Sequence, residues 1–281
     1  MTSLRRRSSA DSSSSTGLSE EQAARAFVER TVLDEQAAAS RASDPQPWGV
    51  YTWLGPVLTL VALIVAGNVL VGLVLPRHGA GRTAGGIAIA IGAELLLLAG
   101  LLAFGRPAAA RAGGWRVAFG LDRIRATDWR AWALGFGFVW LGRTAVGVVA
   151  NVLTHGRATA EASNVHLHHP GAASIATLAV TSILLAPVAE ELMFRGLLLR
   201  TFMRRLSFWP AALLSTALFA LFHVYEVDTV VGAVTLACSV AVLGLCNSYL
   251  VRITGRLTPG ILVHASYNAL AFTVAVLQAV H

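Results

Sequence analysis

A set of ionisable and amide side chains that could do chemistry lies inside the apolar C-terminal half of this 281-residue chain. They are spread over three apolar stretches and comprise Glu190, Glu191, Arg195, His223, His264 and Asn268. Burying such groups in an apolar medium is costly unless they meet partners or serve a reaction. We therefore expect them to converge on one polar cavity.

Spacing within each stretch decides which side chains share a helix face. Adjacent residues point about 100° apart on a helix, so Glu190 and Glu191 face different neighbours. Glu191 and Arg195 are four residues apart and are expected to pair. His264 and Asn268 have the same spacing and are expected to project from one face.

A cavity of this composition can hydrolyse an amide. Glu190 can accept a proton from water while His223 holds and polarises that water. The side-chain N–H groups of His264 and Asn268 can donate to the oxyanion, each contributing on the order of 3–4 kcal/mol. Glu190, His223 and His264 also form a His₂Glu set for zinc, and their spacing neither supports nor excludes that ion.

Other hydrolytic mechanisms lack their motifs. The sequence contains no HExxH helix, no Gly-x-Ser-x-Gly elbow and no Cys–His arrangement. The net charge of +7 comes with arginines in the gaps between apolar runs, where they set topology. We therefore expect no nucleic acid; the expected partners are membrane lipids and a peptide or protein substrate.

Long apolar runs must position these residues. The chain is 55% hydrophobic and 13% charged, whereas soluble domains carry about 25% charged residues. Seven apolar segments run roughly over Leu54–Leu75, Ala84–Phe104, Ala131–Leu153, Ala172–Leu199, Trp209–Val224, Thr229–Val251 and Pro259–Val280. Most reach the roughly 20 residues that cross a bilayer. The pattern predicts an all-α, polytopic membrane bundle of about seven transmembrane helices.

The domain division and the orientation follow from charge and composition. Residues 1–47 are Ser-rich and charged and are predicted to be a disordered or partly helical cytoplasmic tail, while 48–281 form the transmembrane domain. Arginines concentrate after the second, fourth and sixth segments. The positive-inside rule then places the N-terminus in the cytoplasm of a multi-pass cell-membrane protein.

This topology puts the site residues at different depths. By helical rise, His264 lies about 8 Å from the start of its segment, while Glu190 and His223 lie about 20 Å from the ends of theirs. Either the seventh segment starts deep in a cavity, or the sixth does not cross the membrane fully, which a broken helix at Gly232 and Gly244 would permit.

Two further charges lie mid-way along the second and third segments. They are Glu94 and Arg143, at similar depth on consecutive helices. The simplest interpretation is a structural ion pair. A catalytic or proton-carrying role for Glu94 is the alternative.

Three spaced motifs resemble those of a known family. Glu190-Glu191-x-x-x-Arg195, Phe219-x-x-x-His223 and His264-x-x-x-Asn268 resemble motifs of the CPBP family, which includes type II CAAX prenyl endopeptidases and bacterial relatives. The resemblance covers roughly residues 172–275. It implies a glutamate-dependent intramembrane endopeptidase that needs no metal or other cofactor.

In that family pattern Glu190 and His223 activate water, His264 and Asn268 hold the oxyanion, and Glu191, Arg195 and Phe219 are supporting residues. Eukaryotic members act on prenylated peptides, but no prenyl pocket is evident here, so a lipidated substrate stays open. Three alternatives also stay open: a non-enzymatic immunity or scaffold protein of the same fold, a zinc-dependent peptidase, and a transporter with a proton relay.

Overall fold

A computed structural model describes residues 80–111, 113–121, 123–158, 172–224, 227 and 229–280, together with the single positions Gln22, Gly55, Leu58, Val61 and Ala62. Apart from those single positions, the predicted tail and the first apolar segment, Leu54–Leu75, lie outside the described residues.

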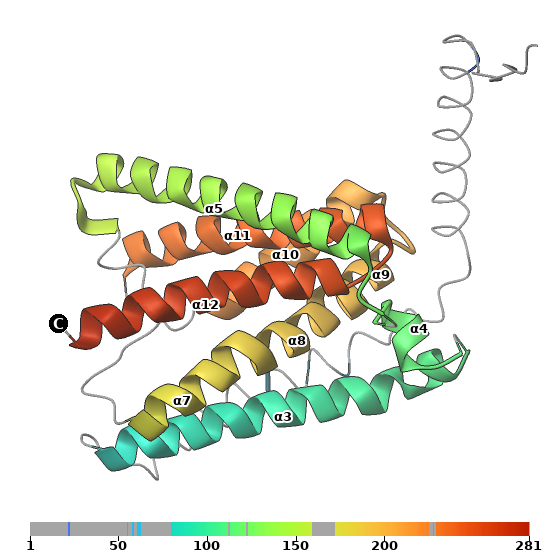
Figure 1. Cartoon of the computed structure of the whole chain (residues 1–281), viewed down its shortest axis with the longest axis horizontal. Helices are drawn as coiled ribbons and strands as arrows, with labels where there is room; N and C mark the ends of the chain where they lie inside the picture. Colours follow the sequence, from blue (N-terminus) through green and yellow to red (C-terminus); the bar gives the residue numbers. More distant parts are fainter. Residues whose placement is uncertain are drawn as a thin grey trace, which may run out of the picture. The chain divides into compact units, whose positions relative to one another are not determined.

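Every element in the described ranges is helical (Figure 1). In chain order these are α3 (Ala80–Arg111), α4 (Trp115–Phe119), α5 (Ala126–Thr154), α7 (Ala172–Val180), η1 (Thr181–Leu185), α8 (Ala186–Glu191), η2 (Leu192–Leu198), α9 (Leu199–Phe202), α10 (Phe208–Val224), α11 (Val230–Thr254) and α12 (Thr258–Val280). The all-α prediction is confirmed for this part of the chain.

Four of these helical stretches are long and apolar enough to cross a membrane, namely Ala126–Thr154, Ala172–Phe202, Val230–Thr254 and Thr258–Gln278. Two shorter apolar stretches are Glu94–Ala103 and Phe208–Val224. Large apolar side chains remain outward-facing, among them Leu134 at 77% and Leu153 at 74% exposure. Such surfaces suit lipid rather than water, so the chain is a membrane protein, with four of the seven predicted spans supported.

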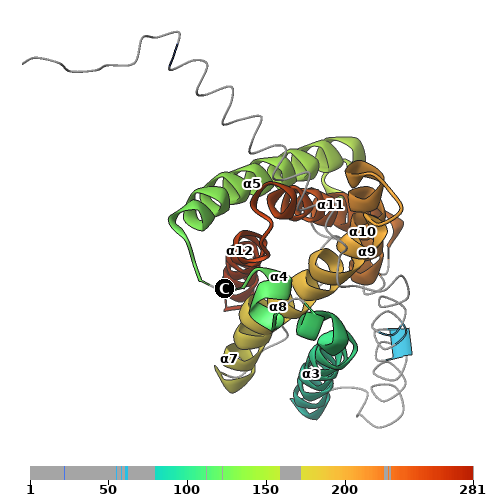
Figure 2. The same ribbon diagram turned by 90° about the vertical axis from the view of Figure 1, so that its right-hand side faces the viewer.

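Glycines let α5 approach its neighbours closely. A Cβ on Gly142 would lie 2.7 Å from Val242 of α11, and one on Gly135 would lie 2.9 Å from Leu250 of the same helix. The two glycines are seven residues apart and so share a face. Small residues at a membrane helix interface permit this packing. Helix α5 lies along α11 and α12, with α10 on the other flank of α11 (Figures 1 and 2).

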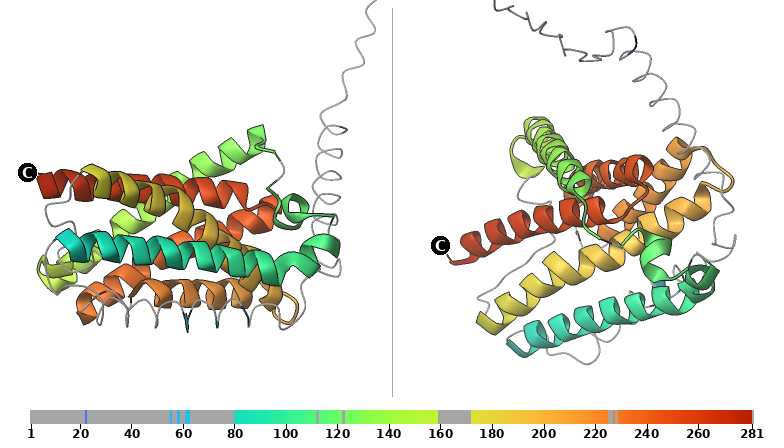
Figure 3. Two further views of the ribbon diagram at one scale, coloured as in Figure 1. Left: turned by 90° about the horizontal axis from the view of Figure 1, so that it is seen from below. Right: turned by 45° about the vertical axis from the view of Figure 1, so that its right-hand side comes forward.

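Helix α3 lies beside α7 and α8, on the opposite side of the bundle from α5 (Figure 3). Leu97 and Leu101 of α3 are 2% and 4% exposed. They are four residues apart, so α3 presents one buried stripe to its neighbours.

The turn between α11 and α12 is buried within the protein. Arg256 and Leu257 are 6% and 0% exposed. Arg256 pairs with Asp128 of α5 at 3.1 Å, and the Leu257 N–H donates to the Phe119 carbonyl at 3.3 Å. Helix α12 therefore begins inside the protein, under α4. A break of the sixth segment at Gly232 and Gly244 is wrong, because α11 runs unbroken from Val230 to Thr254. How far each segment crosses the bilayer stays a prediction.

Candidate active site

The fourth apolar segment is one long helical rod, Ala172–Phe202, that contains two π-helical parts, η1 and η2. In the π-helical turn η1, the Ala186 N–H donates to the Thr181 carbonyl five residues back. Pro187, the next residue, has no N–H to donate. The Ser182 carbonyl is thereby left for a donor outside the rod, and the Asn268 side chain of α12 donates to it at 2.8 Å. Irregular turns of this kind are frequent at functional sites.

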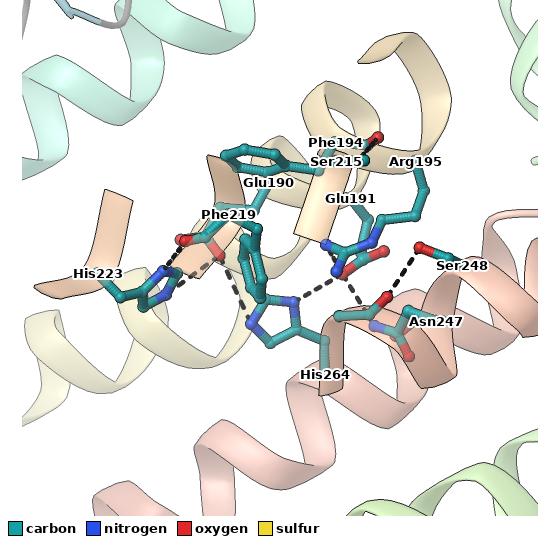
Figure 4. A network of polar contacts seen from close by, with 12 residues as sticks. Glu190, Glu191, Phe194, Arg195, Ser215, Phe219, His223, Asn247, Ser248 and His264 are labelled. Atoms are coloured by element: carbon teal, nitrogen blue, oxygen red, sulfur yellow. Dashed lines mark hydrogen bonds and ion pairs between the residues drawn. The ribbon is translucent and has the colours of Figure 1, made fainter. Parts of the chain in front are cut away.

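The carboxylate of Glu191 is the centre of a buried network (Figure 4). Its Oε1 accepts from Arg195 Nη1 at 3.1 Å, Asn247 Nδ2 at 2.9 Å and His264 Nδ1 at 3.0 Å. Glu191, Arg195 and Asn247 are 0% exposed and His264 is 1% exposed. The pair predicted from the spacing of Glu191 and Arg195 is confirmed.

His264 connects the two glutamates. An ionised Glu191 only accepts hydrogen bonds, so Nδ1 of His264 carries the hydrogen that it donates. In the neutral ring, Nε2 is then an acceptor, and it lies 3.6 Å from Oε2 of Glu190. Two adjacent carboxylates that point apart on α8 are thus joined through one imidazole of α12.

His223 approaches Glu190 from the other side (Figure 4). Its Nδ1 lies 2.8 Å from the Phe219 carbonyl, one turn back, so this nitrogen also carries the hydrogen. Its Nε2 lies 3.7 Å from Oε2 of Glu190. Glu190 itself is 6% exposed.

The ring of Phe219 packs between these groups. Its centroid lies 4.6 Å from that of His223 and 5.7 Å from that of His264, in edge-to-face arrangements. The guanidinium carbon of Arg195 lies 4.3 Å from the same centroid. An aromatic ring in this position lowers the local dielectric constant. The electrostatic interactions among the surrounding charged groups are therefore stronger than they would be in water.

Oε2 of Glu190 therefore faces two imidazole nitrogens at 3.6 and 3.7 Å. These separations exceed a direct hydrogen bond, for which about 2.7–3.2 Å is usual. They suit groups that share one water molecule. A water held there would contact one carboxylate oxygen and two imidazole nitrogens, and the carboxylate can accept a proton from that water.

Asn268 is the predicted site residue that the structure places differently. Sequence spacing put it on one face with His264, in the cavity. In the structure one of its two N–H groups donates to the Ser182 carbonyl of η1. An asparagine amide has a second N–H, so an oxyanion role remains a hypothesis for that hydrogen.

The predicted Glu94–Arg143 pair does not form. The Arg143 guanidinium instead lies over the Tyr267 ring of α12, with its carbon 3.7 Å from the ring centroid. Glu94 Oε2 is buried and makes no hydrogen bond to any described residue. The two helices lie on opposite sides of the bundle, so similar depth along consecutive segments did not bring these charges together (Figure 2).

Asn247 belongs to the site, and sequence analysis missed it. It lies in the middle of α11, and besides Glu191 its Nδ2 contacts the Gly260 carbonyl at 3.2 Å. It ties α8, α11 and the first turn of α12 together. The available signal was an uncharged amide within an otherwise apolar span, which is costly to bury without a partner.

Among the described ranges, no three His, Cys, Asp or Glu side chains are placed to hold a metal ion.

Comparison with known families decides the relationship. Residues 172–270, about a third of the chain, match the family model described as type II CAAX prenyl endopeptidase Rce1-like. This segment is similar to the Rce1-like family. Members of that family are membrane CAAX prenyl endopeptidases. Comparison with curated proteins and with solved structures gives no match.

The Rce1-like segment contains the whole polar cluster. It begins at the first residue of α7 and ends two residues after Asn268. Helices α3, α4 and α5 lie outside it, although α5 packs directly against α11 and α12. Any contribution of α5 to the site is therefore a property of this chain that the family match does not describe.

Proposed function

We propose that this protein is a glutamate-dependent intramembrane endopeptidase. The observation that carries the proposal is the convergence of three groups at one point: Oε2 of Glu190 lies 3.7 Å from Nε2 of His223 and 3.6 Å from Nε2 of His264. The match to an endopeptidase family supports the same reading.

The charges of the cluster favour one shared proton. Glu190 and Glu191 together carry two negative charges against the single positive charge of Arg195. Net charge is unfavourable in a site this dry. The donor role proposed for His264 requires a hydrogen on Nε2 as well as on Nδ1, and an imidazolium of that kind would balance the charges of the cluster.

In that state each group has a distinct task. Glu190 accepts a proton from the attacking water, which His223 orients through Nε2. The hydroxyl goes to the carbonyl carbon, and the proton goes on to the leaving nitrogen as the peptide bond breaks. His264 donates through Nε2 to the oxyanion, with the second N–H of Asn268 as its companion donor. The products are a new carboxylic acid and a new amine, which become a carboxylate and an ammonium ion when the acid proton moves to the amine, so atoms and charge balance.

The substrate is a peptide or protein that reaches the bilayer, lipidated or not. The protein itself is proposed to be a multi-pass cell-membrane protein of about seven spans, with residues 1–47 as a cytoplasmic tail. The buried end of the bundle around α4 and Arg256 would then face the cytoplasm. The clustering of basic loops at that end supports this orientation.

Comparative peptidomics tests the activity and finds the substrate at once. Cells expressing wild-type protein are compared with cells expressing Glu190→Ala, with Glu94→Gln as a matched change of another buried carboxylate. We expect cleavage products that vanish in Glu190→Ala and persist in Glu94→Gln. Equal peptide pools in wild type and Glu190→Ala, with both proteins folded and equally abundant, would rule the peptidase out.

A further inference from the structure

Pro187 lies in the middle of the 31-residue rod Ala172–Phe202, where a helix tolerates proline poorly. A proline inside a helix has no N–H to donate, and its ring crowds the preceding turn. In a membrane, the backbone carbonyl that loses its donor must find another one within the protein. Pro187 is buried and lies three residues before Glu190, so its effect on the backbone falls within one turn of the proposed catalytic carboxylate.

The carbonyl that loses its donor is the main-chain carbonyl of Ser182. The turn η1 shifts the hydrogen bond of the Ala186 N–H by one residue, onto the Thr181 carbonyl. The next N–H in that register would belong to position 187, five residues after Ser182, and proline has none. The proline therefore determines which carbonyl receives no donor from the backbone of the rod.

Hydroxyl groups of the rod do not replace that donor. The Ser182 hydroxyl donates to the Leu178 carbonyl at 2.7 Å, and the Thr181 hydroxyl donates to the Thr177 carbonyl at 2.9 Å. The group that reaches the Ser182 carbonyl is Nδ2 of Asn268 on α12, at 2.8 Å. This contact joins a side chain to a main-chain atom, so it depends on the backbone pairing of η1 and not on the serine side chain.

The contact orients a side chain that shares a helix face with His264. Asn268 lies one turn after His264 on α12, so both project from the same face. His264 is held by the rod as well, with Nδ1 3.0 Å from Oε1 of Glu191 and Nε2 3.6 Å from Oε2 of Glu190. Because one N–H of the Asn268 amide is bonded to a carbonyl, the planar amide cannot turn freely, and the direction of its second N–H is set as well.

We propose that Pro187 is a positioning residue for catalysis: by withholding an N–H from the Ser182 carbonyl, it reserves that carbonyl for Asn268 and so aligns the second amide N–H with the oxyanion. This inference rests on the proposed endopeptidase function and adds the residue that orients one of its donors. Donors that are already aligned are effective because they need not reorganise as charge develops. If position 187 carried an N–H, that N–H would compete for the carbonyl, and the amide would lose its orientation.

Thermal unfolding of the full-length protein in phosphatidylcholine nanodiscs tests the contact without any substrate. Asn268→Leu, which resembles asparagine in shape but has no N–H, should lower the unfolding midpoint by roughly 3–8 °C, because the Ser182 carbonyl loses its donor. In a Pro187→Ala background the N–H of residue 187 can serve that carbonyl, so Asn268→Leu should then lower the midpoint by less than about 2 °C. Equal losses in the two backgrounds would overturn the proposal.

Kinetics test the effect on catalysis. The substrate is the peptide whose cleavage in cells depends on Glu190, synthesised with a fluorophore and a quencher on either side of the cleaved bond. Pro187→Ala should lower kcat roughly 10- to 100-fold and leave KM within about twofold, because the amide contacts the oxyanion and not the bound peptide. Asn268→Leu should lower kcat roughly 100- to 1,000-fold. Adding Pro187→Ala to Asn268→Leu should lower kcat by less than about twofold more, since the proline acts through this amide.

Two further variants separate this effect from a general loss of structure. Pro210→Ala replaces an exposed proline in the first turn of α10, where an N–H has no partner within the helix, and should change neither the unfolding midpoint nor kcat. Pro187→Val supplies the same N–H with nearly the volume of proline, and it takes the place of Pro187→Ala if the smaller side chain prevents folding.

The kinetic outcomes also decide between the two proposals. An unchanged kcat in folded Pro187→Ala would overturn the positioning role. Losses of kcat that multiply in the double variant would overturn it too, because the proline would then act on the shape of the rod and not through Asn268. Absence of any Glu190-dependent cleavage by the wild-type protein would instead overturn the proposed function, and a midpoint of Asn268→Leu that depends on residue 187 would then leave the contact with a structural role alone.

Discussion

The buried pair of Glu191 and Arg195 allows a quantitative test of the network. Replacing Glu191 by Gln removes the charge that faces Arg195, a side chain with 0% exposure. Leaving one partner of a buried pair uncompensated costs about 3–5 kcal/mol. Two features moderate the loss: the Phe219 ring lies 4.3 Å from the Arg195 guanidinium carbon, and the charge of Glu190 also acts on it. We therefore expect the lower end, about 3 kcal/mol.

A double-mutant cycle separates the pair from its surroundings. Arg195→Met should also destabilise by about 3 kcal/mol, because Glu191 then keeps only the side chains of Asn247 and His264 as donors. The double variant Glu191→Gln/Arg195→Met removes both charges. Its loss should fall short of the sum of the single losses by about 2–3 kcal/mol, the upper range of measured couplings.

The chain supplies its own probe of unfolding. Cys246 is buried and Cys238 is exposed, and they are the two cysteines of the sequence. In a Cys238→Ser background, the rate of thiol labelling in a detergent titration reports the opening of the α5–α11 interface around Cys246. Arg130→Met, an exposed control, should shift stability by less than about 0.5 kcal/mol. Additive losses from Glu191→Gln and Arg195→Met would refute the reasoning, since groups that do not interact show no coupling.

Three further outcomes are expected. Gly142→Ala should destabilise the protein by about 1–3 kcal/mol, because its Cβ would lie 2.7 Å from Val242. Gly137→Ala on the same helix meets nothing within 4 Å and should be neutral or stabilising by up to about 1 kcal/mol. The unfolding midpoints of the two variants compare these effects. Asn247→Leu should lower kcat/KM about tenfold, because Glu191 loses the hydrogen bond that holds its carboxylate. Asn247→Asp should lower kcat/KM further, because a second carboxylate would stand where an N–H now donates at 2.9 Å. A kcat/KM of Asn247→Asp equal to that of the wild type would contradict this. Chelation with EDTA should leave cleavage unchanged, and a loss of activity that zinc restores would instead assign the His₂Glu set to a metal.

Local spacing predicted the features that lie within one helix. The pairing of Glu191 with Arg195 follows from a separation of four residues, and it forms at 3.1 Å. The apolar runs from residue 131 onward also matched helices, because a run of about 20 apolar residues has few alternatives in a bilayer. The short fifth run became a helix of 17 residues, Phe208–Val224.

Contacts between helices were predicted less well. Glu94 and Arg143 share a depth by residue count, yet α3 and α5 lie on opposite sides of the bundle, and Arg143 found Tyr267 instead. Depth along a segment says nothing about which helices become neighbours. That choice depends on close packing, here of Gly135 and Gly142 of α5 against α11.

The sequence by itself determined that the chain is a helical membrane protein and which residue types are available for chemistry, because hydrophobicity and helical periodicity act locally. Only the tertiary structure decided that His264 joins both glutamates, that Asn247 completes the network and that Asn268 serves the carbonyl freed beside Pro187. These partners depend on how each helix is rotated and tilted. Rotation and tilt are set by the packing of side chains far apart in the sequence and by an irregular turn, and residue spacing does not reveal the register of that turn.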